Sequence, residues 1–397
     1  MFHNRLTHSL KVAQVGRRLA ESLLRKYPSS EVVTKSLDPD VVEAAALAHD
    51  LGHPPFGHIA DHALCQLAER EGLADGFEGN AQTFRIVTRL AVRRDDAGLG
   101  LDLTRATLAA VAKYPWPRAS SRTPQPYRRK KFSFYADDKE AAEFAMQGLP
   151  KGEKSLECQV MDLADAITYS VHDLEDFFRA GLIPVERLMR DRAYRNQFLE
   201  RWKQAEPDSA AMKHAQHESS WFNGFNNLLG YLSADAYEPG SRKEVDYMDR
   251  FRSVAITSFI SSVEVDLSGK GGALPTLKGP DTSRYLMKFL QRLVWDYVIL
   301  TPRLSTQQAG QIHLITALFE YFLDSLRESR PDRLPTKFRD AAADLKGPKR
   351  GPGAKALDRQ RARLAIDMVA SLTEAQAVVL HKRVAGFESG SVLDLLG

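Results

Sequence analysis

The sequence has almost no cysteine: Cys65 and Cys158 are the only two in 397 residues. This scarcity excludes a disulfide-stapled scaffold and favours a reducing compartment. Long hydrophobic runs are missing too, since no apolar stretch approaches the roughly 18 residues that a membrane-spanning helix needs. The N-terminal segment, MFHNRLTHSLKV, has no apolar signal-peptide core. We therefore expect a cytoplasmic protein with no membrane partner.

Neither sign of charge is in strong excess. The chain has 55 Lys and Arg residues against 51 Asp and Glu, which gives a formal net charge of +4. An excess this small does not by itself indicate a nucleic-acid partner. Apolar residues make up 43% of the chain, enough to fill a sizeable core. The length allows two or three domains, or one large domain with an appendage.

The alternating Val, Ile and Thr runs that mark β-hairpins do not stand out, and a helical period takes their place. Val12, Val15, Leu19 and Leu23 lie at spacings of three and four, which predicts a helix over 6–26. The same pattern predicts helices over 40–51, 61–70, 80–93, 155–179, 249–265, 281–300, 305–328 and 358–385. We therefore predict an all-α fold. The sharpest candidate boundary lies near residues 180–190, and it divides the chain into regions 1–185 and 186–397.

Two basic stretches interrupt the helical pattern. Residues 115–131, PWPRASSRTPQPYRRKK, carry four prolines and six basic residues with no acid. Residues 346–355, KGPKRGPGAK, resemble a flexible basic loop. Both are typical of solvated surface loops. The alternative is contact with phosphate or nucleic acid, and single-stranded DNA is the candidate partner.

One short segment is rich in residue types that bind metal ions or transfer protons. LAHDLGHPPFGHIAD, residues 47–61, holds three histidines and two aspartates, and the first of each form the adjacent pair His49–Asp50. Neighbours in the middle of an α-helix point about 100° apart, but Gly52 predicts a helix end, where the geometry loosens. An imidazole nitrogen and a carboxylate oxygen together suit a divalent cation such as Mn, Fe, Co, Ni or Zn. Two ligands do not make a site, so further ligands must come from elsewhere.

His8 and Asp165 are the candidates for those ligands. His8 lies on the predicted helix 6–26, and Asp165 lies on the helix 155–179, where Asp165, Tyr169 and Asp173 share one face at spacings of four. Taken alone, each is more often structural: a lone helical histidine is usually a surface or satisfied core residue, and an aspartate row is usually a solvated face. These residues indicate a metal site only when they are considered together.

Five segments in order resemble the landmarks of the dGTP triphosphohydrolase family, within the HD-domain phosphohydrolase superfamily. They are RLTHSLKV, AHDLGHPPFGH, FEGNAQTFRI, KYPW and MDLADAITYSVHDLED. The tail, RLAIDMVASLTEAQAVVLHKRVAG, is similar to the family's C-terminal helical segment. The resemblance implies an HD-domain helical core in 1–185, with its basic loop at about 115–131, and additional helices in 186–397 that pack on the core.

The family's activity supplies the expected reaction and metal ligands. Relatives hydrolyse a deoxynucleoside triphosphate (dNTP) to deoxynucleoside plus intact triphosphate, by water attack at the α-phosphate. The resemblance implies that one divalent ion, Mn, Mg, Co, Fe, Ni or Zn, is held by the following residues: His8, His49, Asp50 and Asp165. Such an ion acts as a Lewis acid on a phosphate oxygen.

Three more residues of the same segment match the family's catalytic positions. His58 and Asp61 stand where relatives have a histidine–carboxylate pair, and their spacing of three lets the carboxylate orient the imidazole. An imidazole that titrates near neutral pH can move a proton between water and the leaving oxygen. His53 is a further candidate on the phosphate side. Glycines and prolines around these histidines predict a fixed backbone.

The substrate-binding positions also match. Arg5 corresponds to a family arginine near the phosphates, which its planar guanidinium suits. Tyr169 and Asp173 correspond to positions that contact the deoxyribose: a tyrosine ring against C2′ leaves no room for a 2′-hydroxyl, and the carboxylate accepts from the 3′-hydroxyl. For Glu78, Asn80 and Gln82 of FEGNAQ we expect scaffold hydrogen bonding. Relatives usually carry a further helical segment ahead of RLTHS, so either the protein lacks it or the start shown is internal.

Two alternative interpretations stay open. One is a phosphatase or phosphodiesterase that uses the same HD metal site on another nucleotide. The other is a nucleic-acid-binding or nucleotide-sensing protein whose HD site is not catalytic, which the basic loops motivate. The presence of all six histidines and aspartates of the implied metal and catalytic sets argues against a dead site. The lead hypothesis is a metal-dependent dNTP triphosphohydrolase that forms a homo-oligomer.

Overall fold

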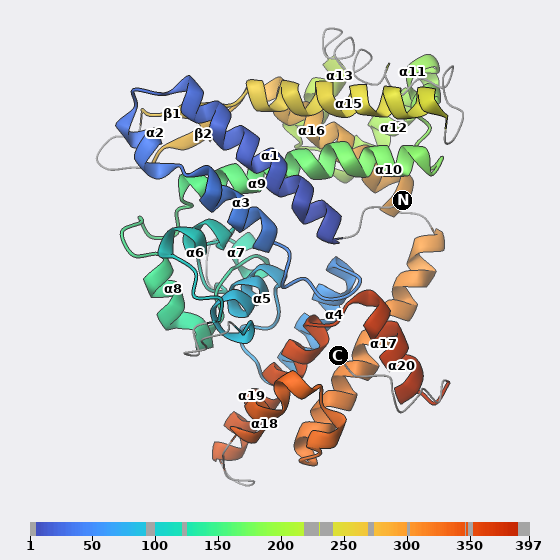
Figure 1. Cartoon of the computed structure of the whole chain (residues 1–397). Helices are drawn as coiled ribbons and strands as arrows, with labels where there is room; N and C mark the ends of the chain where they lie inside the picture. The colour runs from blue at the N-terminus through green and yellow to red at the C-terminus, as the bar shows by residue number, and fades with distance from the viewer. Residues whose placement is uncertain are drawn as a thin grey trace. The chain divides into compact units, whose positions relative to one another are not determined.

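The structure is a computed structural model that describes residues 5–92, 100–120, 125–217, 230, 241–268, 274–299, 302–345, 347 and 352–387. The regular elements of these residues are helices apart from two short strands, so the predicted all-α class is confirmed (Figure 1). The packing of the chain separates two compact units, each built from two segments of sequence. These units alternate along the chain, whereas the predicted regions 1–185 and 186–397 are contiguous and stay a prediction.

Unit 1 comprises Met1–Leu47 and Glu153–Leu304. It contains α1 (Arg5–Lys26), α2 (Glu31–Ser36), most of α3 (Pro39–Ala48), α9 (Leu156–Thr168), η3 (Tyr169–Asp173), α10 (Leu174–Arg179), α11 (Val185–Arg190), α12 (Arg192–Ala205), α13 (Ala210–His217), α15 (Arg242–Ser261), β1 (Glu264–Asp266), β2 (Thr276–Lys278), α16 (Asp281–Val294) and η6 (Trp295–Ile299).

Unit 2 comprises Ala48–Gly152 and Ser305–Gly397. It contains α4 (His58–Arg70), α5 (Gly79–Arg85), η1 (Ile86–Leu90), α6 (Arg105–Val111), α7 (Tyr127–Lys130), η2 (Ala136–Asp138), α8 (Lys139–Ala145), most of α17 (Pro302–Arg327), η7 (Pro331–Arg333), η8 (Thr336–Phe338), α18 (Arg339–Ala343), α19 (Pro352–Ala370) and α20 (Glu374–Val384).

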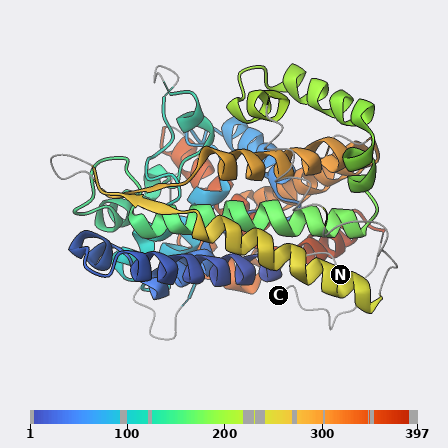
Figure 2. The ribbon, with the colours of Figure 1, turned by 90° about the horizontal axis from the view of Figure 1, so that it is seen from above.

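Unit 1 is organised around α1 and α9, which pack along each other, with α15 beside both (Figure 2). The predicted apolar stripe of α1 is buried, from Val12 to Leu23. Gly16 permits the close approach, because a Cβ at this position would lie 3.0 Å from Val42 and 3.5 Å from Ala164 of α9. The interface between α1 and α9 is therefore fixed by core packing along most of its length.

The two strands form a short antiparallel hairpin that pairs Glu264 with Lys278. Its backbone is tied to α9 by one side chain. The Gln159 amide donates to the Pro275 carbonyl at 3.0 Å and accepts from the Leu277 N–H at 3.0 Å. The hairpin thus covers one end of α9 and adds no larger sheet among the described residues.

Unit 2 has its main core among α4, α17, α19 and α20. The predicted helix 358–385 is wrong as a single element, because α19 and α20 are separate. Thr373 begins α20 with a capping box: its hydroxyl accepts from the Gln376 N–H, and the Gln376 side chain accepts from the Thr373 N–H. These bonds satisfy donors that a continuous helix would have bonded otherwise, so the chain turns at Ser371–Thr373.

Three predicted helices carry a π-helical turn: η1, η3 and η6. The predicted helix 155–179 is continuous through η3 but changes its period between Tyr169 and Asp173. The helix over 281–300 ends in η6, and residue 300 lies outside the described chain. The helix over 80–93 ends at Leu90, and residue 93 is likewise not described. π-turns are rare and occur often at functional sites.

Both cysteines are free thiols, and Cys158 is fully buried. No single helix in the described chain is long and apolar enough to cross a membrane; only the bent pair Gly353–Ala370 and Glu374–Val384 passes that test together.

Candidate metal centre and active site

In unit 1, His8 and Asp165 form a pair. His8 lies on α1 and Asp165 on α9, and His8 Nε2 is 3.0 Å from Asp165 Oδ1. Both side chains are mostly buried, with 17% and 21% of their surface exposed. The two residues are 157 positions apart in sequence, so this contact exists because α1 packs on α9.

Three predicted substrate residues lie on the same two helices. Arg5 is the first residue of α1, and Tyr169 and Asp173 are the first and last residues of the π-turn η3. Burial raises the pKa of Asp173 to about 7, and the charges of Asp176 and Asp165 add to burial while the charge of His8 opposes it. Burial likewise raises the pKa of Tyr169 to about 12. Asp173 is therefore a carboxyl group that can exchange a proton near neutral pH.

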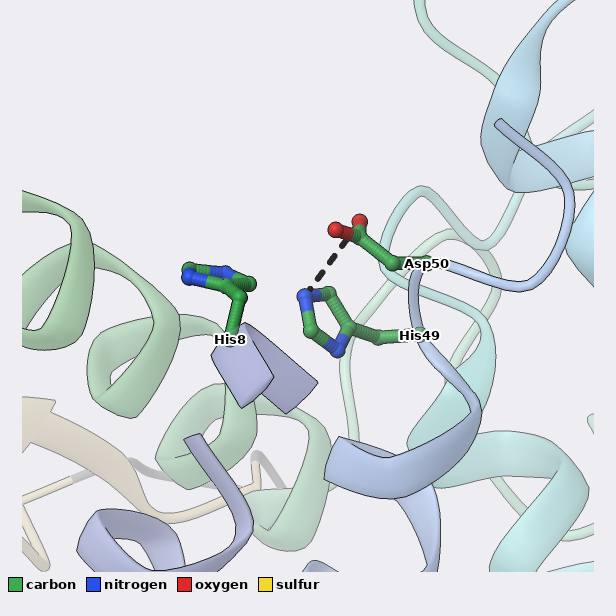
Figure 3. A group of neighbouring side chains, drawn as sticks. All are labelled: His8, His49 and Asp50. Atoms are coloured by element: carbon green, nitrogen blue, oxygen red, sulfur yellow. Dashed lines mark ion pairs between the residues drawn. The ribbon is translucent and has the colours of Figure 1, made fainter. Parts of the chain in front are cut away.

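In unit 2, the pair His49–Asp50 follows directly after the last residue of α3. His49 Nε2 lies 3.3 Å from Asp50 Oδ1, and the dashed line in Figure 3 marks this ion pair. The His49 ring is only 4% exposed. The chain leaves the helix in a tight turn, since the Leu51 N–H donates to the Ala48 carbonyl at 3.0 Å. The pair thus occurs at a helix end, as Gly52 predicts.

Thr83 of α5 holds the loop that carries this pair from both sides. Its hydroxyl donates to the His49 carbonyl at 3.0 Å and accepts from the Gly52 N–H at 2.9 Å. Gly52 must be glycine, because a Cβ there would lie 2.0 Å from the Thr83 nitrogen. Gly79 is similar, with a Cβ position 2.2 Å from His53 Nδ1. The start of α5 is therefore pressed directly against the histidine-rich loop.

Asp61, on the first turn of α4, is shared by two histidines. Its Oδ2 lies 3.1 Å from His58 Nδ1 and 3.2 Å from His53 Nδ1. The other nitrogen of His53, Nε2, is 3.6 Å from Asp50 Oδ1, so His53 connects the two carboxylates. His58 is 81% exposed, whereas His53 and Asp61 are each 14% exposed. These three residues also offer ligand atoms within 4.8 Å of one another, so they form a group able to hold a metal ion.

In this cluster, Asp61 and His53 each stabilise the charged form of the other. Burial opposes ionisation of Asp61, but hydrogen bonds from His53 and His58 outweigh it and hold the pKa of Asp61 well below its usual range. Burial also opposes the charged form of His53, and the hydrogen bond and charge of Asp61 overcome it, so the pKa of His53 is raised. Asp61 is therefore a carboxylate that accepts from both imidazoles.

The backbone of the PPFG turn is held in an unusual conformation. Phe56 has φ 69°, in the left-handed region that a bulky residue rarely adopts. Its N–H donates to the Glu374 carboxylate of α20 at 3.3 Å, and its ring packs on the main core of unit 2. The neighbouring Gly57 also has a positive φ and begins α4. This turn places His58 and Asp61 on the first helical turn.

Buried polar contacts fix α5 in turn. Asp367 of α19, fully buried, accepts from Gln82 Nε2 at 2.8 Å and from Arg85 Nη2 at 2.9 Å. Glu78 caps α5 by accepting from its first N–H groups and pairs with Lys131 at 2.9 Å. The scaffold hydrogen bonding expected of Glu78 and Gln82 is thus confirmed, and its main partner, Asp367, was not anticipated.

Two family models match the chain. The model described as HD domain covers residues 5–170, and the one described as phosphohydrolase-associated domain covers residues 277–383. A deoxyguanosinetriphosphate triphosphohydrolase-like protein of Streptomyces coelicolor is 36% identical over 394 residues, which is 96% of this chain and 83% of the relative. The chain belongs to the dGTP triphosphohydrolase family. Proteins of the same name from Bifidobacterium longum and Corynebacterium efficiens share 34% and 31% identity, over 95% and 96% of the chain.

The dGTP triphosphohydrolase family is one of HD-domain nucleotide phosphohydrolases, and HD domains bind divalent metal ions. The HD match contains every predicted site residue except Asp173, three positions beyond its end. The phosphohydrolase-associated match contains Asp367. The resemblance stated from the sequence is therefore confirmed at the level of family.

The structure brings together some of the predicted site residues within each unit. His8 meets Asp165 in unit 1; His49 meets Asp50, and His53 and His58 meet Asp61, in unit 2. Thr83 is a site residue that the sequence analysis missed, although it follows FEGNAQ at once. Its only sequence signal is that neighbourhood, because its partners lie 31 and 34 positions away.

The basic loop 115–131 is partly integrated into the fold, and residues 121–124 of it lie outside the described chain. Arg118 pairs with Glu69 at 2.6 Å, Lys131 pairs with Glu78, and the Arg128 guanidinium lies 4.3 Å from the centre of the Trp116 ring. These three cationic side chains contact other residues of unit 2, whereas the cations of a simple surface loop are surrounded by water. Residues 346 and 348–351 of the second basic stretch lie outside the described chain.

Proposed function

We propose that the protein hydrolyses a dNTP to a deoxynucleoside and intact triphosphate. One observation carries the proposal: a chain with complete HD-type histidine–aspartate pairs matches relatives described as dGTP triphosphohydrolase-like over almost its whole length. Water attacks the α-phosphorus, the bond from this phosphorus to the 5′ oxygen breaks, and the 5′ oxygen takes a proton. The products are one deoxynucleoside and one triphosphate.

The metal ligands in this proposal are two imidazole–carboxylate pairs: His8 with Asp165, and His49 with Asp50. The donor chemistry fits a divalent cation, since two imidazole nitrogens and two carboxylate oxygens suit Mn, Fe, Co, Ni or Zn, and the carboxylates also suit Mg. Each pair is already compact, with nitrogen-to-oxygen distances of 3.0 and 3.3 Å. When bound, the cation acts as a Lewis acid on the α-phosphate and positions water.

His58 moves the proton in this proposal. With Nδ1–H donated to Asp61, the lone pair of Nε2 is available as a base toward water, and the protonated ring is available as an acid toward the 5′ oxygen. The 81% exposure of His58 leaves that nitrogen accessible to substrate. His53, between Asp61 and Asp50, holds Asp61 in position and offers a positive charge on the phosphate side.

The sugar is recognised by η3 in this proposal. Tyr169 packs against C2′ and excludes a 2′-hydroxyl, and Asp173 accepts from the 3′-hydroxyl as a carboxylate. Arg5 contacts phosphate oxygens from the first turn of α1. A ribonucleotide should therefore be a poor substrate.

The test is product analysis. We expect the purified protein, given each of the four dNTPs with Mn²⁺, Mg²⁺ or Co²⁺, to release deoxynucleoside and triphosphate that separate by ion-exchange chromatography. Asp50→Ala should abolish turnover without unfolding, whereas Asp40→Ala, at a carboxylate 79% exposed, should not. Release of only orthophosphate or pyrophosphate would contradict the proposal and favour another HD-type hydrolase.

Three broader expectations belong to the same proposal: a homo-oligomer, a cytoplasmic location and contact with single-stranded DNA through the basic loops. Light scattering of the purified chain tests the first of these. Steep salt dependence of oligonucleotide binding, with a log–log slope near the number of phosphates contacted, tests the last.

A further inference from the structure

Unit 2 contains a cavity that shares no residue with the candidate active site. Its volume is about 750 Å³, and it is lined by the turn after α4, the basic loop, η2 and α19. Leu73 and Phe134, both nearly buried, form apolar parts of its wall. This volume lies within the range of roughly 300–1,000 Å³ that is usual for small-molecule sites.

Two guanidinium groups of the lining have unused hydrogen-bonding capacity. The Nε of Arg129 is buried and has no hydrogen-bond partner among the described residues. Arg359 is exposed on α19, and its guanidinium likewise has no acceptor in the described part of the chain. A buried donor without an acceptor is unfavourable, and an anion is the ligand that would satisfy it.

Of the two aspartates of the lining, Asp75 is already engaged, so Asp137 is the carboxylate that remains to offset the two arginines. Asp75 also lines the cavity, but its carboxylate is engaged by Arg363 at 2.5 Å and by the Ala136 N–H at 3.0 Å. Arg118 is engaged as well, through Glu69 and the Ala74 carbonyl. Arg129 and Arg359 are therefore the positive charges of the lining that remain available to a ligand.

The backbone around Arg129 is fixed in advance. Arg118 Nε donates to the Arg129 carbonyl at 3.1 Å, and the Ala119 N–H donates to the Arg128 carbonyl at 3.0 Å. Arg128 itself stacks on Trp116. A cation held by a preformed backbone binds a ligand at a smaller entropic cost than one on a free loop.

We propose that this cavity binds a small phosphorylated molecule of nucleotide size. Arg129 and Arg359 contact the phosphate oxygens, Leu73 and Phe134 contact the apolar face, and Asp137 and Gln360 accept hydrogen bonds from hydroxyl or amino groups. The exposed Asp137 carboxylate favours a small ligand over a nucleic-acid strand, which needs a continuous row of cations. This proposal does not rest on the hydrolysis proposed above.

The experiment is a calorimetric titration of the full chain in EDTA, which prevents turnover, at constant ionic strength. The probes are inorganic triphosphate, dGTP and a single-stranded oligonucleotide. We expect dGTP to bind, and the double variant Arg129→Gln/Arg359→Gln to raise its dissociation constant by about tenfold or more. Arg333→Gln, which removes a partly exposed arginine of the same unit outside the lining, should change nothing.

Three outcomes would overturn the proposal. The first is an unchanged dissociation constant in the double variant. The second is loss of dGTP binding in Asp50→Asn with retention in the double variant, which would assign the ligand to the HD site. The third is binding of the oligonucleotide but not of dGTP, which would assign the arginines to nucleic acid. If the double variant unfolds, the single variant Arg359→Gln, at an exposed side chain, should still weaken dGTP binding about threefold.

Discussion

At the scale of single residues, one carboxylate of the candidate active site contacts two histidines. Asp61 Oδ2 lies within 3.2 Å of both His53 Nδ1 and His58 Nδ1, but the two imidazoles differ in environment. His53 is largely buried and reaches Asp50 with its other nitrogen, while His58 is exposed. Asp61 therefore holds one buried imidazole, His53, and one accessible imidazole, His58. We assign proton transfer to His58 alone.

His58→Gln should lower kcat by about 100-fold or more, because positioned acid–base groups contribute factors of this size. The fold should be unchanged, since the side chain is exposed. His62→Gln is the matched control: it removes an exposed histidine of the same helix, one residue beyond Asp61. Steady-state rates with a saturating dNTP decide, and equal rates for both variants would remove His58 from the mechanism.

Asp173→Asn should stabilise the metal-free protein increasingly as pH rises. Burial raises the pKa of Asp173 to about 7 in the folded protein, from 3.8. Between these values the folded state holds a proton that the unfolded chain has released, so wild-type stability falls as pH rises. The advantage of the variant should grow from about pH 4 to about pH 7, then stay constant, reaching up to about 4 kcal/mol.

Urea titrations in EDTA at pH 4.5 and pH 7.5 measure this effect. Asp208→Asn, at a fully exposed carboxylate, is the control and should show no such trend. A difference between Asp173→Asn and wild type that is the same at both pH values would contradict the burial of Asp173. Substrate affinity should fall in Asp173→Asn, because an amide cannot accept from the 3′-hydroxyl with a negative charge.

At the scale of elements, α5 is the support of the histidine-rich loop. Its Thr83 hydroxyl connects the His49 carbonyl to the Gly52 N–H, and its Gly79 leaves room for the His53 ring. α5 is held in turn by Asp367 of α19, 282 positions from Arg85 in sequence. The C-terminal part of unit 2 therefore contributes to the geometry of a loop near the N-terminal end of that unit.

Thr83→Val should weaken both stability and metal binding. The variant keeps the shape of the side chain but leaves the buried Gly52 N–H without its acceptor, which costs about 1–3 kcal/mol. Thr88→Val is the control, since the Thr88 hydroxyl donates to the Phe84 carbonyl one turn earlier in the same helical segment. Thermal unfolding and metal titration measure the two effects. Equal metal affinity in the two variants would show that Thr83 does not position His49 and Asp50.

Asp367→Ala should be among the most destabilising single changes in unit 2. Asp367 is fully buried and accepts from both Gln82 and Arg85, so its removal leaves the Arg85 guanidinium with Asp138 alone. Breaking a buried ion pair by removing one partner costs about 3–5 kcal/mol. Asp344→Ala, at an exposed position of the same unit, should have little effect. Chemical denaturation followed by circular dichroism decides between these outcomes.

The sequence predicted the elements whose signal is local. The apolar stripe of α1 and the helix end near Gly52 follow from local patterns of a few residues. The pairing of His58 with Asp61 was implied by the family resemblance, and a spacing of three permits it. The π-turn between Tyr169 and Asp173 was missed, because it preserves helical composition and changes only the period. The break before α20 was missed because Thr373 reads as a tolerable helix residue until its capping box is seen.

Contacts that depend on tertiary packing could not be predicted in detail. Nothing in the spacing of Thr83 indicates that its hydroxyl reaches residues 49 and 52, and nothing near Asp367 indicates Arg85 as its partner. The His8–Asp165 contact was anticipated only through the family resemblance, because residues 157 positions apart carry no common local pattern. Long-range partners are set by how helices pack, which local periodicity does not encode.

At the scale of the whole molecule, we propose that four side chains share one metal ion: His8, His49, Asp50 and Asp165. We expect one tightly bound divalent ion per chain, and loss of that ion in both Asp50→Asn and Asp165→Asn. Asp40→Asn and Asp344→Asn, at exposed carboxylates of unit 1 and unit 2, should retain it. Elemental analysis after equilibrium dialysis gives the count. Retention of the ion in Asp165→Asn, or two ions per wild-type chain, would show that the pairs do not share one metal.

In the proposed reaction, water attacks the α-phosphorus of a dNTP and the 5′ oxygen leaves. The most direct measurement is turnover in ¹⁸O-labelled water, followed by mass spectrometry of the separated products. We expect one labelled oxygen in intact triphosphate and none in the deoxynucleoside. Label in the deoxynucleoside, or in orthophosphate released without triphosphate, would contradict it.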